Sequence, residues 1–494
     1  MDKWFRYLNE TRSSPAGIRR SIKTLTDMGG NTGGNPTGYQ RMKDPLQGKK
    51  KKSDNLPNII VILTDDQRWD AIGYAGNKII KTPEQDRLAS EGTYFNKAFV
   101  TTPICGASRA SIITGLYERK HNFTLGGTTL DPIYLQENYP GVLKKNGYHT
   151  GFFGKFGIKN NGDLFNIFSE FEVYDRNNKF KDHRGYYYKT IEKDTVHLTR
   201  YTGHKALTFI DEAPSDEPFC LSISFSAPHA HDGAWEGIKK QYFWQEEVDN
   251  YFKETEIPDP NIASYDRFAA LPKEVRKGFN RVRWFWRYDT KERYQESVKG
   301  YYRMIGGVDI ELGKIREMLS KKGIADNTII VWMGDNGYFL GERQMAGKWL
   351  MYDNSIRVPL IIYDPRVKKH YDVDDMVANV DLAPTILDFA GVKSDLKTHG
   401  MSLVPYVYSG KSKGKREELM IEHLWDFQPI PASEGIRTEQ WKYFRYRNIN
   451  APEELYDLVN DPQELNNLAS NKEYKYILQN MRNKLDLKIT LYSK

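Results

Sequence analysis

From Pro57 onward, short runs of aliphatic and β-branched residues alternate with longer amphipathic stretches. This alternation is typical of a parallel or mixed sheet covered by helices. Residues 304–320 have apolar positions at helical spacing, and the stretch ends before Gly323. The pattern predicts an α/β fold built on a large, mixed, mostly parallel sheet flanked by helices. The predicted strands are residues 58–64, 149–153, 219–225, 328–333 and 358–363.

The C-terminal part of the chain has a different pattern. After about Lys397 it contains short aromatic strands, such as residues 441–446, turn residues, and a last amphipathic helix from Asn471. This pattern predicts a smaller α+β subdomain with a short antiparallel sheet, packed on the main sheet. We therefore divide the chain into residues 1–56, a main domain of residues 57–396 and a C-terminal subdomain of residues 397–494.

Residues 1–56 carry the whole excess of positive charge. They hold twelve Lys and Arg against five Asp and Glu, and the 494-residue chain has a formal net charge of +7. The glycine-rich segment 29–38 and the lysine run 49–52 favour a flexible leader over a packed layer. A tether to a polyanion or to a membrane surface is the alternative. No aromatic residues are interleaved with the lysine run, so we predict no nucleic-acid partner.

The composition also excludes several classes of protein. The longest aliphatic run, residues 59–63, is far shorter than the roughly 20 apolar residues of a membrane-spanning helix, so no transmembrane segment is predicted. The two cysteines, Cys105 and Cys220, exclude a disulfide scaffold and a thiolate zinc cage. Residues 1–24 lack the apolar stretch of a secretory signal, so the sequence by itself favours the cytoplasm and leaves the localisation open.

Four of the predicted strands lead into polar or charged residues. In open α/β sheets, ligands bind beyond the carboxyl ends of the strands, so the residues that follow the strands are expected to share one site. In chain order these residues are Asp65 and Asp66, Lys155, His229, and Asp335 with Asn336.

The acidic members of this set suit a hard metal ion. Asp65, Asp66 and Asp335 offer three carboxylates and Asn336 an amide oxygen, with no cysteine or histidine beside them in the sequence. Such oxygen ligands favour Ca²⁺ or Mg²⁺ over zinc. Two other interpretations stay open: the aspartate pair caps the next helix, and residues 334–337 form only a turn.

Cys105 begins a segment with the pattern of a helix. Residues 105–114 form the helical stretch, and Gly115 marks its end. A side chain in the first turn faces free backbone N–H groups and the positive end of the helix dipole, a position that favours an anion. Taken alone, this cysteine would be interpreted as a small buried hydrophobic residue.

The segment around Cys105, with Ala107, Ser108 and Arg109, resembles the signature of the sulfatase family. It lies about forty residues after an aspartate pair that ends a first strand, as in that family. Further motifs follow in the expected order as far as residue 470 or so. They are residues 147–151 leading to Lys155, the turn 227–229, residues 334–337, Lys348 before residues 351–359, residues 454–458, and Asp461 with Pro462.

The resemblance is to the formylglycine-dependent sulfatases of the alkaline phosphatase superfamily, and in particular to bacterial polysaccharide sulfatases and to N-acetylglucosamine-6-sulfatases. It implies an alkaline-phosphatase-like fold with a catalytic domain over residues 57–396. It also implies that a formylglycine-generating maturation enzyme oxidises Cys105 to formylglycine, whose hydrated aldehyde is the nucleophile. The implied metal is Ca²⁺, with Mg²⁺ second, and its ligands are Asp65, Asp66, Asp335, Asn336 and residue 105.

The other matched residues would handle the sulfate group. The resemblance implies that Lys155 and Lys348 bind the sulfate and that Arg109 orients the nucleophile. His229 would be the general acid that protonates the departing alcohol. The cations are needed because a sulfate ester is an anion that repels nucleophiles.

Two positions depart from the pattern of the family. Ala107 stands where the commonest signature has proline, which leaves open which maturation system recognises Cys105. Gly157 stands where many sulfatases have a histidine, two residues after the lysine matched by Lys155. The role of that histidine in the collapse of the sulfated intermediate is therefore absent or filled by another group. His231 and His121 are candidates, with a structural role as the alternative for each.

Together these features predict the hydrolysis of a sulfate ester, with a sulfated carbohydrate as substrate. Trp284, Trp286, His423 and Trp425 are candidates for residues that face the sugar, against a plain packing role. Two alternatives stay open for the function. One is a phosphonate monoester or phosphodiester hydrolase of the same superfamily, and the other is a non-catalytic protein that binds sulfated glycans.

Overall fold

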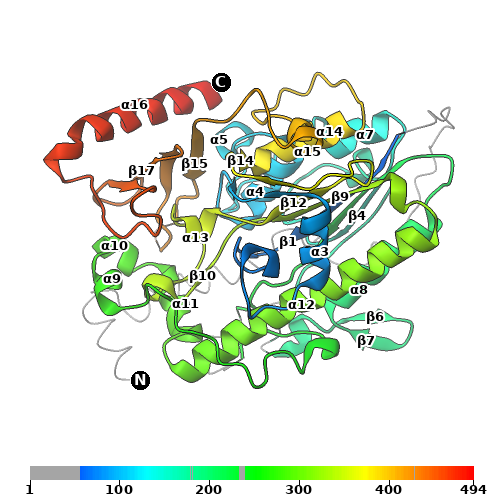
Figure 1. Cartoon of the computed structure of the whole chain (residues 1–494), viewed down its shortest axis with the longest axis horizontal. Helices are drawn as coiled ribbons and strands as arrows, with labels where there is room; N and C mark the ends of the chain where they lie inside the picture. The colour runs from blue at the N-terminus through cyan, green and yellow to red at the C-terminus, as the bar shows by residue number, and fades with distance from the viewer. Residues whose placement is uncertain (1–55, 178–179, 181, 233–239, 428, 494) are drawn as a thin grey trace.

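The computed structural model describes residues 56–177, 180, 182–232, 240–427 and 429–493, so the predicted leader lies almost wholly outside the described residues. At its centre is an eight-stranded sheet with the strand order β13-β2-β12-β9-β1-β8-β4-β5 (Figure 1). The strands from β9 to β5 in this order are parallel, whereas β12 runs antiparallel to both β9 and β2. The predicted mixed, mostly parallel sheet is confirmed. The strand bounds are β1 Asn58–Thr64, β2 Thr93–Phe95, β4 His149–Gly154, β5 Glu170–Val173, β8 Phe219–Ser224, β9 Thr328–Gly334, β12 Leu360–Tyr363 and β13 Tyr371–Val373.

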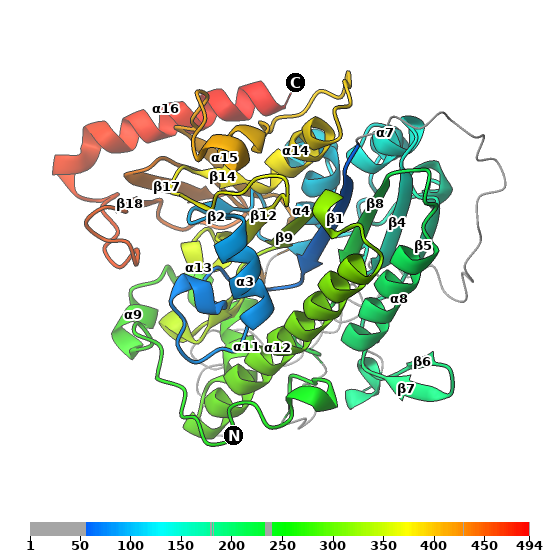
Figure 2. The ribbon, with the colours of Figure 1, turned by 45° about the vertical axis from the view of Figure 1, so that its right-hand side comes forward.

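The central strand β1 is buried on both faces, which explains its unbroken aliphatic run. Ile59 and Val61 belong to one hydrophobic core, and Ile60 and Ile62 belong to the other. A strand of this kind needs helices on both faces of the sheet. Figure 2 shows α3, α8 and α12 on one face and α4, α7 and α14 on the other. Their bounds are α3 Pro83–Glu91, α4 Cys105–Thr114, α7 Tyr139–Lys145, α8 Leu198–Glu212, α12 Lys291–Lys321 and α14 Leu382–Phe389.

The parallel register brings the carboxyl ends of four strands to one edge of the sheet. Leu63 of β1 pairs with Ser224 of β8 on one side and with Met333 of β9 on the other. Gly154, the last residue of β4, also pairs with Ser224. The segments that follow β1, β4, β8 and β9 therefore start side by side, as the sequence predicts.

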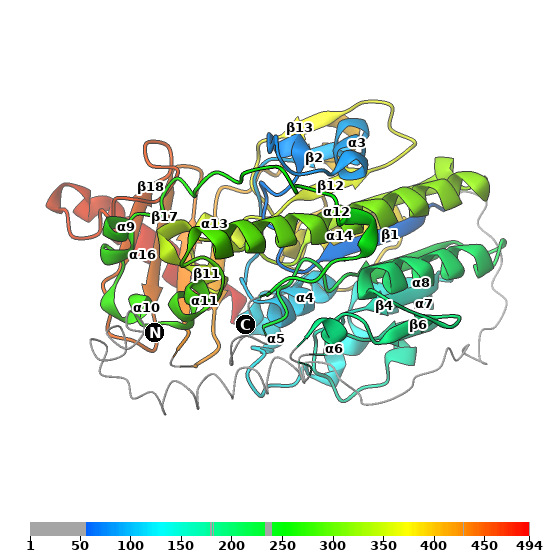
Figure 3. The same cartoon turned by 90° about the horizontal axis from the view of Figure 1, so that it is seen from below.

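The C-terminal part forms a separate antiparallel sheet with the order β15-β16-β17-β18, and α16 packs on β16 and β17. Figure 3 shows this unit at one end of the molecule, on the same side as α9, α10 and α11. The predicted short antiparallel sheet is confirmed, and the domain boundary at residue 397 stays a prediction. The bounds are β15 Leu419–His423, β16 Ser433–Arg437, β17 Trp441–Tyr446, β18 Glu454–Asp457 and α16 Lys475–Tyr492.

Several predicted elements differ in their bounds from the observed ones. The helix predicted over residues 304–320 is the second half of α12, which begins at Lys291 after an N-cap by Thr290. The strand predicted from residue 358 begins at Leu360. Pro359 has no N–H to donate, and the N–H of Val358 bonds to the carbonyl oxygen of Ala98 outside the main sheet.

Among the described residues, no helix combines the length and the apolar character needed to cross a membrane. The remaining α-helices and strands are short and connect the elements above. They are β3 Ala98–Phe99, α5 Glu118–His121, α6 Pro132–Gln136, β6 Lys189–Ile191, β7 Asp194–Val196, α9 Tyr265–Ala269, α10 Lys273–Arg276, α11 Phe279–Arg287, β10 Phe339–Leu340, β11 Ala346–Gly347, α13 Asp353–Ile356, β14 Val377–Ala378 and α15 Val404–Ser409.

Candidate active site

Cys105 is the first residue of α4, as the sequence predicts. The helix ends at Thr114, and Gly115 closes it in the left-handed conformation with its N–H bonded to the carbonyl oxygen of Ser111. The thiol is free, and Cys105 is 7% exposed. The helix therefore holds this side chain at its N-terminal end, beside the carboxyl edge of the main sheet.

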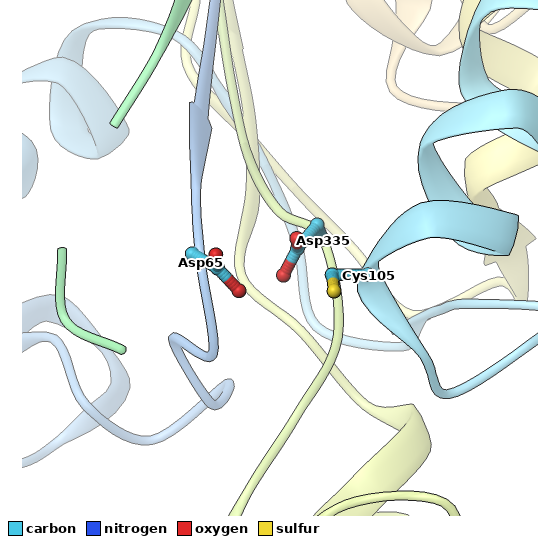
Figure 4. Close-up of side chains that lie close together, drawn as sticks. All are labelled: Asp65, Cys105 and Asp335. Atoms are coloured by element: carbon cyan, nitrogen blue, oxygen red, sulfur yellow. The ribbon is translucent and has the colours of Figure 1, made fainter. Parts of the chain in front are cut away.

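The side chains of Asp65, Cys105 and Asp335 converge from three different elements (Figure 4). One potential ligand atom from each lies within 4.8 Å of the other two. Asp65, Asp66 and His229 form a second group that meets the same limit. The segments after β1 and β9 and the start of α4 thus supply one shared cluster.

Asp66 does not cap a helix. Its backbone is in the left-handed region at φ 72°, where a residue with a side chain is strained. The N–H of Asp66 donates to Asp335 Oδ1 at 3.1 Å, and its carbonyl oxygen accepts from the hydroxyl of Tyr301 at 2.7 Å. Asn336 donates from Nδ2 to Asp66 Oδ1 at 2.6 Å. The aspartate pair and the turn after β9 are therefore bonded to each other, and the capping interpretation is wrong.

Three buried cations surround these carboxylates. Lys155 bonds to Asp65 and lies 3.7 Å from the sulfur of Cys105. Lys348 donates to Asp66 Oδ1 at 2.5 Å. Arg109, one turn along α4 from Cys105, donates from Nε to Asp335 Oδ2 at 2.8 Å. Each lysine or arginine thus faces a carboxylate next to Cys105.

The close packing of charges shifts the pKa values of the site. Burial alone would raise the pKa of Asp65, but Lys155, Lys348 and Arg109 hold it well below its usual range. Burial and the charge of Asp65 raise the pKa of Asp335 to about 6. Three carboxylates at this spacing compete for the same cations, so the least well compensated of them tends to keep a proton.

His229 lies on the segment after β8, next to the carboxylate of Asp66. Its Nε2 is 3.5 Å from Asp66 Oδ2, and its Nδ1 is 2.6 Å from the carbonyl oxygen of Ala230. Burial, together with the charges of Arg176 and Lys348, holds the pKa of His229 well below its usual range. The carbonyl partner at Nδ1 fixes the ring and leaves Nε2 directed to the carboxylate cluster.

The donor set fits a divalent cation. Asp65 Oδ1, Asp66 Oδ2 and Asn336 Oδ1 are buried and have no hydrogen-bond partner among the described residues. Unpaired buried carboxylate oxygens are costly, and hard oxygen atoms at this spacing are the ligands that Ca²⁺ and Mg²⁺ prefer. The cluster could therefore hold a metal ion. All nine residues predicted from the sequence come together here, and their individual roles stay predictions.

Neither His121 nor His231 is placed to replace the histidine that is missing at Gly157. His121 bonds through Nε2 to Ser111 and accepts from the N–H of Phe123. His231 bonds through Nε2 to the carbonyl oxygen of Phe180 at 2.5 Å. Both rings have partners outside the carboxylate cluster, which supports the structural alternative for each.

Two of the four aromatic candidates, His423 and Trp425, are buried, whereas Trp284 and Trp286 are half-buried. His423 is fully buried, and its role as a sugar-facing residue stays a prediction. Trp425 is 5% exposed and packs in a small core with Ile104 and Ala107. Trp284 lies under the guanidinium of Arg281, and Trp286 packs edge-on against Phe279. Their role as sugar-facing residues was predicted from aromatic content alone, which does not distinguish a packing residue from one that contacts a substrate.

Sequence reasoning missed a second layer of charged groups. Asp175 lies 3.5 Å from Lys155 Nζ, and its neighbour Arg176 reaches within 3.5 Å of His229 Nε2. Asp232 and Arg283 lie beside them. Asp175 follows the short strand β5, which runs parallel to β4. Because β5 has no aliphatic run, the sequence pattern did not reveal the strand or the residue after it. Arg283 belongs to α11, which does not directly follow a strand of the main sheet. The rule that residues after strands share one site therefore could not identify it.

Comparison with known families agrees with this geometry. The sulfatase family model matches residues 57–392. A model of the C-terminal region of N-sulphoglucosamine sulphohydrolase matches residues 341–490. The two matches together cover the main sheet and the C-terminal unit.

Individual relatives are also sulfatases. The chain is 28% identical to an N-acetylglucosamine-6-O-sulfatase of Bacteroides thetaiotaomicron, over 86% of this chain and 85% of that protein. It is 27% identical to an arylsulfatase of Clostridium perfringens, over 86% and 93% of the two chains.

Solved structures show the same fold. A protein in complex with its substrate D-glucosamine-2-N,6-O-disulfate has a TM-score of 0.74 and 25% identity, and the match covers 89% of this chain and 98% of that one. A phosphonate monoester hydrolase of Agrobacterium radiobacter has a TM-score of 0.71 at 23% identity, with 88% and 96% covered, which is a likeness of fold. The family match over most of the chain, together with these relatives, establishes that this chain belongs to the sulfatase family and is a sulfuric ester hydrolase.

Proposed function

We propose that this protein hydrolyses a sulfate ester on a carbohydrate, with formylglycine made from Cys105 as the nucleophile and with Ca²⁺ in the carboxylate cluster. The observation that carries the proposal is the convergence of Asp65, Cys105 and Asp335 within 4.8 Å, ringed by buried cations. A protein that only binds glycans would not need a thiol at that point. The catalytic domain of this proposal is residues 57–396, with residues 397–494 as the subdomain beside it.

The lysines supply the sulfate-binding groups. Burial alone would lower the pKa of Lys155, yet Asp175 and Asp65 hold that pKa above its usual range, so its ammonium group stays charged. Burial would likewise lower the pKa of Lys348, and Asp66 holds it above its usual range. Two fixed ammonium groups next to Cys105 can neutralise sulfate oxygens while charge moves to the leaving oxygen. Arg109 positions the reacting group through its bond to Asp335.

His229 is the proposed general acid. It must carry a proton at Nε2 when the ester bond breaks, and the neighbouring cations oppose that protonated state in the free protein. The negative charge of a bound sulfate counters those cations and favours the imidazolium. Proton transfer to the leaving alcohol then restores the neutral ring.

Two groups would complete the site. A divalent cation held by Asp65, Asp66, Asp335 and Asn336 would supply positive charge against the sulfate oxygens, and formylglycine at position 105 would supply a nucleophilic hydroxyl. A maturation enzyme that recognises Cys105, Ala107 and Arg109 is the implied partner. The carbohydrate substrate is proposed because one relative is named as an N-acetylglucosamine-6-O-sulfatase and one structural neighbour holds a disulfated glucosamine as substrate.

Mass spectrometry of the peptide that spans residues 101–109 tests the proposal most directly. Protein from the native host is expected to carry an aldehyde in place of the thiol, and its activity on para-nitrophenyl sulfate is expected to fall at least a thousandfold in Cys105→Ala. Full activity with the sulfur still in place would refute the formylglycine mechanism.

A comparison of substrates separates the proposal from its superfamily alternative. Rates on para-nitrophenyl sulfate and on bis(para-nitrophenyl) phosphate are measured with the same preparation. A clear preference for the sulfate is expected. A preference for the phosphodiester would assign the site to the phosphonate and phosphodiester hydrolases instead.

A further inference from the structure

A group of three arginines gathers around one carboxylate beside His229. We call Arg176, Arg283, Arg287 and Asp232 the arginine cluster. Arg283 donates from Nη2 to Asp232 Oδ2 at 2.8 Å, and Arg176 Nη2 lies 3.4 Å from the same oxygen. Arg287 bonds to the other oxygen of Asp232. Three guanidinium groups thus share one carboxylate, which leaves positive charge uncompensated.

Asp175 does not remove this excess. It lies 3.4 Å from Arg176 Nη1, but it also lies 3.5 Å from Lys155 Nζ and accepts from Ser226 at 2.8 Å. Its charge is therefore divided between the arginine cluster and the proposed sulfate lysine. The cluster therefore has positive charge to offer an additional anion.

The arginine cluster also contains unused hydrogen-bond donors. Among the residues that the structure describes, Arg283 Nε and Nη1 and Arg176 Nε have no hydrogen-bond partner, although Arg283 is 7% and Arg176 is 8% exposed. Buried guanidinium nitrogens without partners are costly, and folded proteins seldom keep them without a purpose. Arg287 Nε is also unpaired among the described residues, but Arg287 donates to the hydroxyl of Tyr338 at 2.8 Å and acts as a structural counter-ion.

Arg283 is held in place by aromatic rings. Its guanidinium lies 4.6 Å from the ring centre of Trp349 and 4.9 Å from that of Phe279. Trp349 directly follows Lys348 and has a left-handed backbone at φ 82°, which is an uncommon and strained conformation for a bulky residue. The chain therefore accepts strain next to Lys348 at the point where Trp349 supports Arg283.

The arginine cluster lies on the leaving-group side of the proposed site. Arg176 Nη2 is 3.5 Å from Nε2 of His229, the residue proposed to protonate the departing alcohol. The contacts found for Arg283 among the described residues go to Asp232, Trp349 and Phe279, and not to Cys105 or the metal candidates. A group bound there belongs to the saccharide rather than to the scissile sulfate.

We infer that the arginine cluster binds a second anionic group of the substrate, a sulfate or a carboxylate on the saccharide that carries the scissile sulfate. This inference rests on the proposed function and deepens it. The preferred substrate then has at least two negative charges, one at the reacting sulfur and one at Arg283 and Arg176. Charge-assisted hydrogen bonds to buried guanidinium groups supply the selectivity.

Binding to a protein that cannot turn over tests the inference. Calorimetric titrations use Cys105→Ala protein and disaccharides that share one backbone and carry one, two or three sulfate groups. A second sulfate is expected to raise the affinity about tenfold or more. Adding Arg283→Gln is expected to remove most of that gain, and Arg283→Lys to keep part of it. A monosulfated disaccharide that contains a uronate separates a carboxylate from a sulfate as the second anion.

Arg281→Gln is the matched control, because Arg281 lies in the same helix and stacks on Trp284 and Phe285 instead. The Arg281→Gln variant is expected to keep the rise in affinity that the second sulfate brings. No gain from the second sulfate, or an equal loss in both glutamine variants, would overturn the inference. Thermal unfolding of each variant shows that it is folded. The proposed function is tested separately by turnover of para-nitrophenyl sulfate, so either idea can fail without the other.

Discussion

At the scale of single residues, Gly157 shows why this chain lacks the histidine that many sulfatases have. Its backbone is left-handed at φ 71°, a conformation that favours glycine. A Cβ built at this position would lie 3.1 Å from Cδ of Arg109 and 3.8 Å from Cε of Lys155. A side chain at this position would therefore press on Arg109 and touch Lys155, the two cations that flank Cys105.

Gly157→Ala is expected to damage both stability and catalysis. The left-handed backbone costs about 1 kcal/mol for a residue with a Cβ, and the contact with Arg109 adds to it. A shift of Arg109 would misplace the groups around Cys105, so kcat on para-nitrophenyl sulfate is expected to fall by roughly tenfold to a hundredfold. Urea denaturation and steady-state kinetics measure the two effects.

Gly127→Ala is the matched control for this prediction. Gly127 also has a left-handed backbone, at φ 86°, but a Cβ there would meet nothing within 4 Å. It is expected to show only the backbone cost and an unchanged kcat. Equal kinetic losses in the two variants would mean that the loss in Gly157→Ala does not come from the contact with Arg109, and would contradict the argument.

At the scale of helices and strands, burial decides what the sequence can predict. The strand β1 and the strand β9 are buried throughout, so their aliphatic runs mark them clearly. β5 was not predicted, because residues 170–173 are a stretch of four residues with no aliphatic run, and Asp175 was missed with it. The first half of α12 was missed because its tyrosines and charged residues are fixed by tertiary contacts, such as that of Tyr301 with Asp66.

A buried lysine joins the C-terminal sheet to the catalytic part of the chain. Lys442 of β17 is fully buried and bonds to Asp353 at the start of α13, to Glu464, and to the carbonyl oxygen of Met351. Lys442→Met would leave the buried carboxylate of Glu464 and the partly buried carboxylate of Asp353 without this partner. We expect a loss of about 3 kcal/mol in the free energy of unfolding, measured by urea denaturation.

Lys484→Met provides the comparison for Lys442. Lys484 of α16 pairs with Glu418, but its side chain is 31% exposed. Exposed pairs contribute about 0–1 kcal/mol, so this variant is expected to unfold close to the unsubstituted protein. If the two variants lose the same free energy of unfolding, the contact between β17 and α13 is not what holds the C-terminal sheet in place.

At the scale of the whole molecule, the site is assembled from residues nearly three hundred positions apart, between Asp65 and Lys348. The sequence could place Asp65, Lys155 and Asp335 together because parallel strands end at one edge. It could not place Arg176, Asp232 and Arg283, because their meeting depends on how α11 packs beside the segment after β8. Strand edges are predictable from pattern, whereas contacts between loops and helices follow from the finished fold.

The carboxylate cluster also links metal binding to the stability of the whole chain. A cation that binds only the folded state stabilises it by about 2.7 kcal/mol at a concentration one hundredfold above its dissociation constant. Protein stripped with a chelator is therefore expected to unfold at a lower temperature, and added Ca²⁺ is expected to restore the midpoint at lower concentration than Mg²⁺ does, because its larger shell tolerates an irregular set of oxygen ligands.

Two variants show whether this shift comes from the proposed ligands. Asp66→Asn removes one carboxylate of the cluster, and the Ca²⁺-dependent rise in the unfolding midpoint is expected to shrink or vanish. Asp211→Asn removes a carboxylate of α8 whose side chain is 62% exposed and pairs with Lys322, so the rise is expected to persist. A rise that survives Asp66→Asn, or an absence of any rise in the unsubstituted protein, would place the ion elsewhere. The unpaired oxygens of Asp65, Asp66 and Asn336 would then need another explanation.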